Sequence, residues 1–115
     1  MAVIPLQHPD KLAGKSGQAL WETLTCGDTG AWQLLDDYND NTVTVSGTFN
    51  SETLTMQGTN DGGTTVFTLT DPSATAIALT AAGGKLIVEA PKEIRPSFSG
   101  SSGGDVDVRV QMRKV

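Results

Sequence analysis

The fold is decided by one stretch of the chain, ETLTMQGTNDGGTTVFTLTDP, which occupies residues 52–72. Apolar and polar residues alternate on both sides of its polar centre. Leu54 and Met56 lie among Thr and Gln residues, and Val66 and Leu69 lie among threonines. Alternation with a period of two is typical of a strand that is buried on one face only. The stretch therefore predicts a β-hairpin.

The centre of this hairpin is the run Asn60–Gly63. Asn, Asp and Gly tolerate the positive φ angles that the primed hairpin turns require, so this run predicts a tight turn. A turn of that kind fixes the register of the two strands beside it. The hairpin indicates a fold class but contains no catalytic chemistry.

Length and composition extend the all-β prediction to the whole chain. A chain of 115 residues fits one domain, which buries about 65% of the surface that its unfolded form exposes. It contains 13 glycines and only 5% aromatic residues, a composition that favours β-strands joined by many turns. The net charge of −5 and the lack of a basic cluster disfavour nucleic acid as a partner.

Cys26 is the single cysteine of the sequence. One thiol forms neither an intrachain disulfide nor a thiolate zinc site, so a reducing compartment is the simpler expectation. The N-terminus lacks the basic and apolar regions of a secretion signal, and no apolar run approaches the length that spans a bilayer. We therefore expect a protein made in the cytoplasm, without a membrane partner.

Residues 1–17 are predicted to form an extended N-terminal arm, and residues 18–115 a single β-sandwich domain. Two prolines and two glycines interrupt any period in this arm. Its apolar start is the informative part, because such a segment gains little from exposure to water. It is expected to fray, to pack back on its own domain, or to lie across a neighbouring subunit. The apolar residues are Val3, Ile4, Pro5 and Leu6.

Short strands separated by turn residues continue along the rest of the chain. Their spacing predicts an antiparallel β-sandwich of immunoglobulin-like architecture or a small barrel. Besides the hairpin, the predicted strands are residues 18–25, 31–35, 42–49, 75–80, 85–89, 93–99 and 105–113.

Four local expectations follow from the strand pattern. Leu20 and Leu24 are predicted on the face opposite Trp21, because alternate residues share a face. The apolar run 85–89 is predicted to be a well-buried strand. Gly47 is expected to mark a β-bulge, and Pro96 an edge strand or a bulge.

No residue pattern predicts catalysis, a cofactor or a metal, and we expect a protein that is not an enzyme. His8 lies in the arm without a local partner, and Cys26 lacks a histidine beside it. The acidic pairs Asp36–Asp37 and Asp105–Asp107 are more simply loop and surface residues. The oxygen-rich run 36–41 lacks the spacing of a calcium loop and predicts a turn that hydrogen-bonds its own backbone.

Three aromatic residues are candidates for a binding surface: Trp21, Trp32 and Tyr38. Aromatic side chains on the faces of β-sandwiches stack on sugars in carbohydrate-binding modules. They also dominate hydrophobic cores and protein interfaces, so both interpretations stay open.

The chain resembles a group of small β-sandwich proteins encoded among the head and tail genes of tailed bacteriophages. The resemblance covers the sequence from about Thr42 to the end. It is carried by the runs 56–62 and 69–72, by Ala81-Ala82-Gly83, and by the run 93–100 with its Arg95-Pro96 pair. The hairpin and the Ile94-Arg95 pair also resemble the second half of discoidin-type domains. Those domains are longer and commonly carry cysteines near both ends.

The phage resemblance implies a virion structural protein, most simply a capsid decoration or cement protein that binds and stabilises the assembled head. It implies the major capsid protein and neighbouring copies of the chain as partners, in a homo-oligomer on the capsid surface. The discoidin resemblance implies a tail- or fibre-associated carbohydrate-binding module instead. The residues that we expect at an interface are Val3, Ile4, Pro5, Leu6, Trp21, Trp32 and Tyr38.

Overall fold

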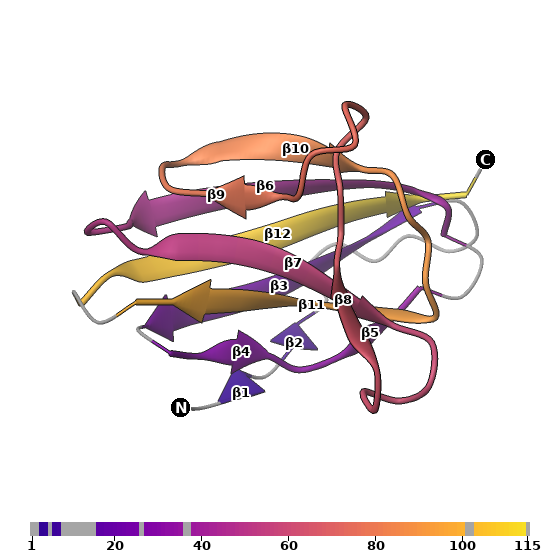
Figure 1. Cartoon of the computed structure of the whole chain (residues 1–115), viewed down its shortest axis with the longest axis horizontal. Helices are drawn as coiled ribbons and strands as arrows, with labels where there is room; N and C mark the ends of the chain where they lie inside the picture. The colour runs from indigo at the N-terminus through magenta and orange to yellow at the C-terminus, as the bar shows by residue number, and fades with distance from the viewer. Residues whose placement is uncertain are drawn as a thin grey trace.

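The protein folds into two β-sheets that pack face to face (Figure 1). The computed structural model describes residues 3–4, 6–7, 16–25, 27–35, 38–100 and 103–114. Within these ranges all regular structure is β-strand. No helix long and apolar enough to cross a membrane occurs among the described residues.

One sheet has seven strands and the other has five. The seven-stranded sheet follows the order β1-β4-β11-β7-β8, with β5 paired to β11 and β9 paired to β7. Its strands are β1 (Val3–Ile4), β4 (Thr29–Gly30), β5 (Gln33–Leu34), β7 (Thr53–Thr59), β8 (Val66–Thr68), β9 (Ala78–Leu79) and β11 (Glu93–Ser99). The five-stranded sheet follows the order β10-β6-β12-β3-β2. Its strands are β2 (Leu6–Gln7), β3 (Ser16–Thr25), β6 (Asp40–Thr48), β10 (Gly83–Ile87) and β12 (Asp105–Arg113).

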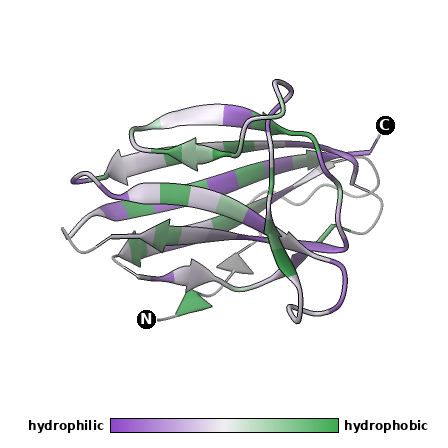
Figure 2. Ribbon diagram, viewed as in Figure 1, coloured by the Kyte–Doolittle hydropathy of each residue, from purple (hydrophilic) through white to green (hydrophobic). Residues whose placement is uncertain are grey.

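This arrangement confirms the predicted antiparallel β-sandwich and decides against a closed barrel. All strand pairs are antiparallel except β1 with β4. Hydrophobic and hydrophilic bands alternate along the long strands (Figure 2), and the inward residues of both sheets form one apolar layer. That layer contains Ala19, Trp21, Leu24, Leu35, Val43, Val45, Phe49, Leu54, Met56, Leu69, Ile77, Ile87, Ile94, Phe98, Val106, Val108, Val110 and Met112.

A β-bulge in β3 overturns the predicted placement of Trp21. Val106 pairs with Leu24 and Val108 pairs with Trp21, so three steps along β3 oppose two steps along β12. The extra residue lets Trp21 and Leu24 both reach the core, where each is fully buried. Thr23 absorbs the change with a φ of 58°. Its backbone N–H donates to Asp107 Oδ1 over 2.8 Å.

Two further features accommodate the buried Trp21 ring, a hydrogen bond and a glycine. The indole Nε1–H donates to the carbonyl oxygen of Ala31 at 2.9 Å, which satisfies its only polar group. A Cβ on Gly30 would lie 2.5 Å from Cδ1 of the ring. Glycine is therefore required beside the ring.

The run 85–89 is not the well-buried strand that the sequence predicts. β10 is an edge strand of the five-stranded sheet, so only Ile87 faces the core. Leu86 and Val88 are 43% and 54% exposed. An apolar run on an edge has the same sequence pattern as a buried central strand, which explains the error.

Gly47 and Pro96 also differ from expectation. β6 pairs with β12 in continuous register through Gly47, so no bulge occurs there. Its φ is 121°, and a Cβ would lie 2.3 Å from the carbonyl oxygen of Asp105. Pro96 lies within β11, between the short segments where β5 and β4 pair with the strand. Its nitrogen is directed to the same side as that of Phe98, into the gap between those two strands.

The tight primed turn occurs at a different place from the predicted one. Asn50 and Ser51, between β6 and β7, have φ angles of 49° and 67°, the geometry of a type I′ turn. The hairpin of β7 and β8 is closed instead by a six-residue loop, residues 60–65, in which Gly62 and Gly63 have positive φ. The hairpin itself is confirmed, because Gln57, Gly58 and Thr59 pair with Thr68, Phe67 and Val66.

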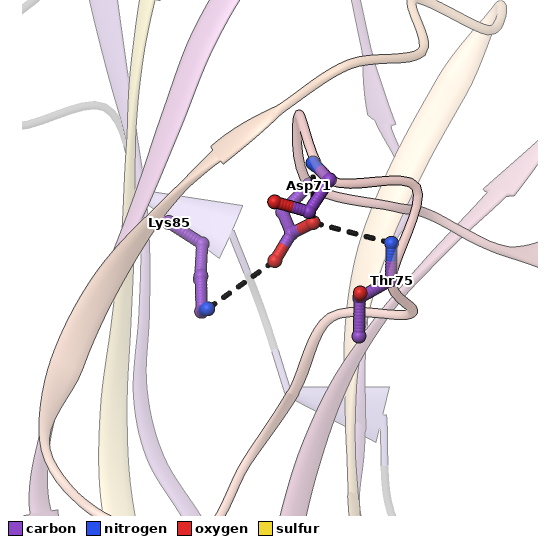
Figure 3. Close-up of polar contacts among 4 residues, drawn as sticks. Asp71, Thr75 and Lys85 are labelled. Carbon is purple, nitrogen blue, oxygen red and sulfur yellow. Dashed lines mark hydrogen bonds and ion pairs between the residues drawn. The ribbon is translucent and has the colours of Figure 1, made fainter.

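Asp71 connects the turn at residues 71–75 to the edge strand β10. Lys85 of β10 forms an ion pair with Asp71 Oδ2 at 3.2 Å, and the backbone N–H groups of Ser73 and Thr75 donate to Oδ1 (Figure 3). The carboxylate is nearly buried. The bond from Thr75 lowers its pKa most, and Lys85 and Ser73 lower it further against the opposing effect of desolvation.

Asp71 predicts a loss of stability in acid. Its pKa in the folded protein lies below the ordinary value of 3.8, so its stabilising contribution is present above that pH and is lost as the pH falls through the lowered pKa. We expect Asp71→Asn to unfold at lower urea concentration than wild type at pH 7, with a difference that shrinks below pH 3.8. Asp105→Asn, at an exposed carboxylate, is the control and changes little. A constant gap between Asp71→Asn and wild type across this range contradicts the assignment.

The bulge predicts that replacement by glycine has different effects on the free energy of unfolding at Thr23 and at Thr44. A non-glycine residue at positive φ costs about 1–3 kcal/mol, so Thr23→Gly is expected to leave the free energy of unfolding unchanged or to raise it by up to about 1 kcal/mol. Thr44→Gly, in a regular part of β6, is expected to lower it by about 1 kcal/mol. Urea titrations measure both. Equal losses for the two variants contradict the strained bulge.

Candidate functional site

Two short N-terminal strands pair with the protein's own sheets. β1 pairs with β4 in the seven-stranded sheet, and β2 pairs with β3 in the five-stranded sheet. The segment therefore passes from one sheet to the other along the lower border in Figure 1. Ile4 packs against the core, whereas Val3 is 62% exposed. The backbone of Leu6 is described but its side chain is not, and Pro5 lies outside the described residues.

The three predicted aromatic residues do not form one platform. Trp21 is fully buried in the core, so its side chain reaches no ligand or partner in the folded protein. Tyr38 packs against the core, with Lys114 Nζ 5.8 Å from the centroid of its ring. Trp32 is half-buried and lies elsewhere, beneath Arg95.

Several candidate chemical residues lie outside the described part of the chain. These are His8, Cys26, Asp36 and Asp37. Asp40, within the oxygen-rich run 36–41, forms an ion pair with Arg113 over 3.9 Å. Within the described ranges no three His, Cys, Asp or Glu side chains cluster in a way that would hold a metal ion.

The most structured polar cluster lies on the outer face of the seven-stranded sheet and is centred on Arg95. Arg95 of β11 pairs with Gln57 of β7, and its Nε–H donates to Gln57 Oε1 at 2.9 Å. Its guanidinium carbon lies 4.3 Å from the centroid of the Trp32 ring, a cation–π contact. The neighbours Ile94 and Pro96 face inward and are buried, which directs Arg95 outward.

The loop 60–65 packs against Trp32. The Thr59 hydroxyl donates to Asp61 Oδ1 and accepts from the backbone N–H of Gly63, each at 2.9 Å. Asp61 Oδ1 also accepts from the N–H of Thr65 at 2.8 Å. That bond is the main cause of the lowered pKa of Asp61. A Cβ on Gly63 would lie 3.1 Å from Trp32 Nε1, so the loop approaches the indole closely.

Two exposed apolar residues lie beside this cluster. Leu34 of β5 pairs with Glu93, Glu93 pairs with Thr59, and Thr59 pairs with Val66 of β8. Residues directly opposite each other in antiparallel pairs share a face. Leu34 and Val66 therefore lie on the outer face in the row of pairs next to that of Arg95, and they are 47% and 37% exposed. We call this surface the Arg95 face, formed by Trp32, Leu34, Gln57, Val66 and Arg95.

Arg95 is partly desolvated and has no ionic partner among the residues that the structure describes. Partial burial lowers the pKa of its guanidinium below the ordinary value, but an arginine keeps its charge at neutral pH. Glu93 lies two residues away on the same face and forms no ion pair with it. The two Nη atoms of Arg95 donate to no acceptor within the described ranges.

Sequence reasoning found Trp32 but missed Arg95 as part of a site. Arg95 entered only as a marker of the phage resemblance. The available signal was its position between Ile94 and Phe98, at the outward parity of an alternating strand. Its contact with Trp32 depends on tertiary structure and has no signature in the sequence.

Comparison with known proteins supports the fold. The sequence matches no protein-family model and no curated protein. The structure is similar to the SPBc2 prophage-derived protein YomS, with a TM-score of 0.64 and 14% identity over 88% of this chain and 96% of that one. At this identity the likeness shows a shared fold.

Two weaker likenesses have TM-scores below 0.5 and add nothing to the fold assignment. The cupin domain of Schizosaccharomyces pombe Cnp3 has a TM-score of 0.47 and 9% identity, over 96% of this chain and 60% of that one. The K1 cleaved adhesin domain of Lys-gingipain from Porphyromonas gingivalis W83 has a TM-score of 0.44 and 14% identity, over 97% and 85%.

The packing of the N-terminal segment predicts different effects at two adjacent residues. Ile4→Ser removes an apolar contact with the core and is expected to lower the free energy of unfolding by about 1–2 kcal/mol. Val3→Ser is the matched control and is expected to change it by less than about 0.5 kcal/mol. Thermal or urea unfolding measures both variants. Equal stability of the two variants contradicts the packing of Ile4 on its own domain.

Proposed function

We propose that the protein is a structural component of a tailed-phage particle that binds and stabilises the assembled head as a decoration or cement protein. Its partners are then the major capsid protein and neighbouring copies of itself, and its place is the capsid surface. It acts through surface contacts and performs no chemistry.

The observation that carries the proposal is the likeness to a prophage-derived protein. It extends over 88% of this chain and 96% of YomS with a TM-score of 0.64, so the whole sandwich is involved. The sequence resemblance to phage head and tail proteins points in the same direction and depends on separate features, the turn residues and the Arg95-Pro96 pair.

The distribution of exposed residues supports a role in binding. Aromatic residues and Arg are enriched at the centres of protein interfaces. The Arg95 face combines these types on one outer face of the sandwich. The net charge of −5 favours solubility of the free protein before it binds. On a symmetric shell each weak contact is repeated many times, which raises the overall strength of attachment.

The carbohydrate-binding alternative has lost most of its structural support. Its candidate stacking residues are Trp21, Trp32 and Tyr38, and of these Trp21 is fully buried while Tyr38 packs on the core. Trp32 alone remains, with Arg95 stacked on its ring.

Copy number in purified particles tests the proposal. We expect the protein to be found by quantitative mass spectrometry in particles of the phage or prophage that carries the gene, at a number comparable to that of the major capsid protein. A repeated lattice offers one site per capsid subunit or per symmetry axis. A few copies per particle would indicate a tail or connector component instead. Absence from washed particles would contradict a virion role altogether.

A further inference from the structure

We propose that the Arg95 face is the surface that docks on the capsid, and that the capsid protein presents a carboxylate side chain, Asp or Glu, to the Arg95 guanidinium. This inference rests on the proposed function and names the surface and the chemistry of its partner.

The geometry of Arg95 is that of a prepared binding group. Its Nε–H is held by Gln57 at 2.9 Å, and its guanidinium plane is supported by the Trp32 ring at 4.3 Å. Both contacts restrict the side chain before any partner arrives, so less rotamer freedom is lost on binding. The two Nη groups remain without an acceptor among the described residues.

A carboxylate fits this arrangement better than a neutral acceptor. Guanidinium and carboxylate groups form paired, charge-assisted hydrogen bonds that are stronger than neutral ones. Partial desolvation of Arg95, which lowers its pKa, also reduces the screening of such a pair by water. The Nη atoms are not among the buried polar atoms that lack a partner, so a carboxylate can reach them from outside the sheet.

The surroundings of Arg95 favour a protein as the source of that carboxylate. Leu34 and Val66 lie on the same face, in the row of strand pairs next to that of Arg95 and Gln57, and are 47% and 37% exposed. A folded protein surface offers apolar side chains and a carboxylate within one contact area. Glu93 stands on the same face. It would repel an acidic partner group placed away from Arg95, which adds positional specificity.

Binding of charge-matched variants to particles tests the inference. Arg95→Gln is expected to bind about 10- to 100-fold more weakly than wild type in co-sedimentation with particles stripped of the protein, because it removes charge-assisted hydrogen bonds. Arg109→Gln is the matched control. Arg109 lies on the outer face of the other sheet, is exposed and bonds to Gln18 at 2.7 Å, and its loss is expected to leave binding unchanged. Arg95→Lys keeps the charge without the planar fork and is expected to bind with intermediate strength.

The outcomes separate this inference from the proposed function. If Arg95→Gln binds the particles as strongly as wild type does, and circular dichroism shows that all variants are folded, the proposed docking surface is wrong. The proposed virion role is then unaffected. Failure of the wild type to bind the particles overturns both. Binding of the wild type to uronic-acid oligosaccharides on a glycan array, lost in Arg95→Gln while particle binding is retained, would assign the surface to an acidic glycan and overturn the protein partner.

Discussion

The structure depends on the complete burial of one side chain, Trp21. The ring lies in the apolar layer between the two sheets, and its indole N–H must find an acceptor there. Three local features follow from that requirement. The bulge at Thr23 brings Trp21 to the inner face, Gly30 leaves room beside the ring, and the carbonyl of Ala31 accepts the N–H. The chain after β4 is therefore held in a fixed position by a residue ten positions earlier.

This anchoring also shapes the outer surface. Ala31 directly precedes Trp32, so the hydrogen bond that satisfies the core residue also places the half-exposed one. Trp32 then lies between the loop 60–65, at Gly63, and the Arg95 guanidinium. The hydrogen bond of Trp21 in the core and the cluster around Arg95 on the surface are thus linked through the consecutive residues Ala31 and Trp32.

Sequence periodicity predicted the fold well wherever strands are regular. β11 and β12 alternate without interruption, and β7 does so as far as Gly58. Leu54 and Met56, the alternating apolar residues of the predicted hairpin, are fully buried. It failed where one residue changes the parity, as at Thr23, and where an edge strand such as β10 carries apolar residues. The site was harder still. Trp32 was recognisable by residue type, but its contact with Arg95 joins positions 63 residues apart along the sequence, and no local pattern encodes it.

We propose that the outer face of the seven-stranded sheet is the surface through which the protein binds the shell of a phage particle. A cryo-electron microscopy map of the particle, at a resolution that shows side chains, tests this most directly. We expect this sheet to face the shell, with the Nη atoms of Arg95 within hydrogen-bonding distance of a capsid carboxylate and with Leu34 and Val66 covered. A map in which the Arg95 face is turned to solvent while another surface of the sandwich contacts the shell would contradict it.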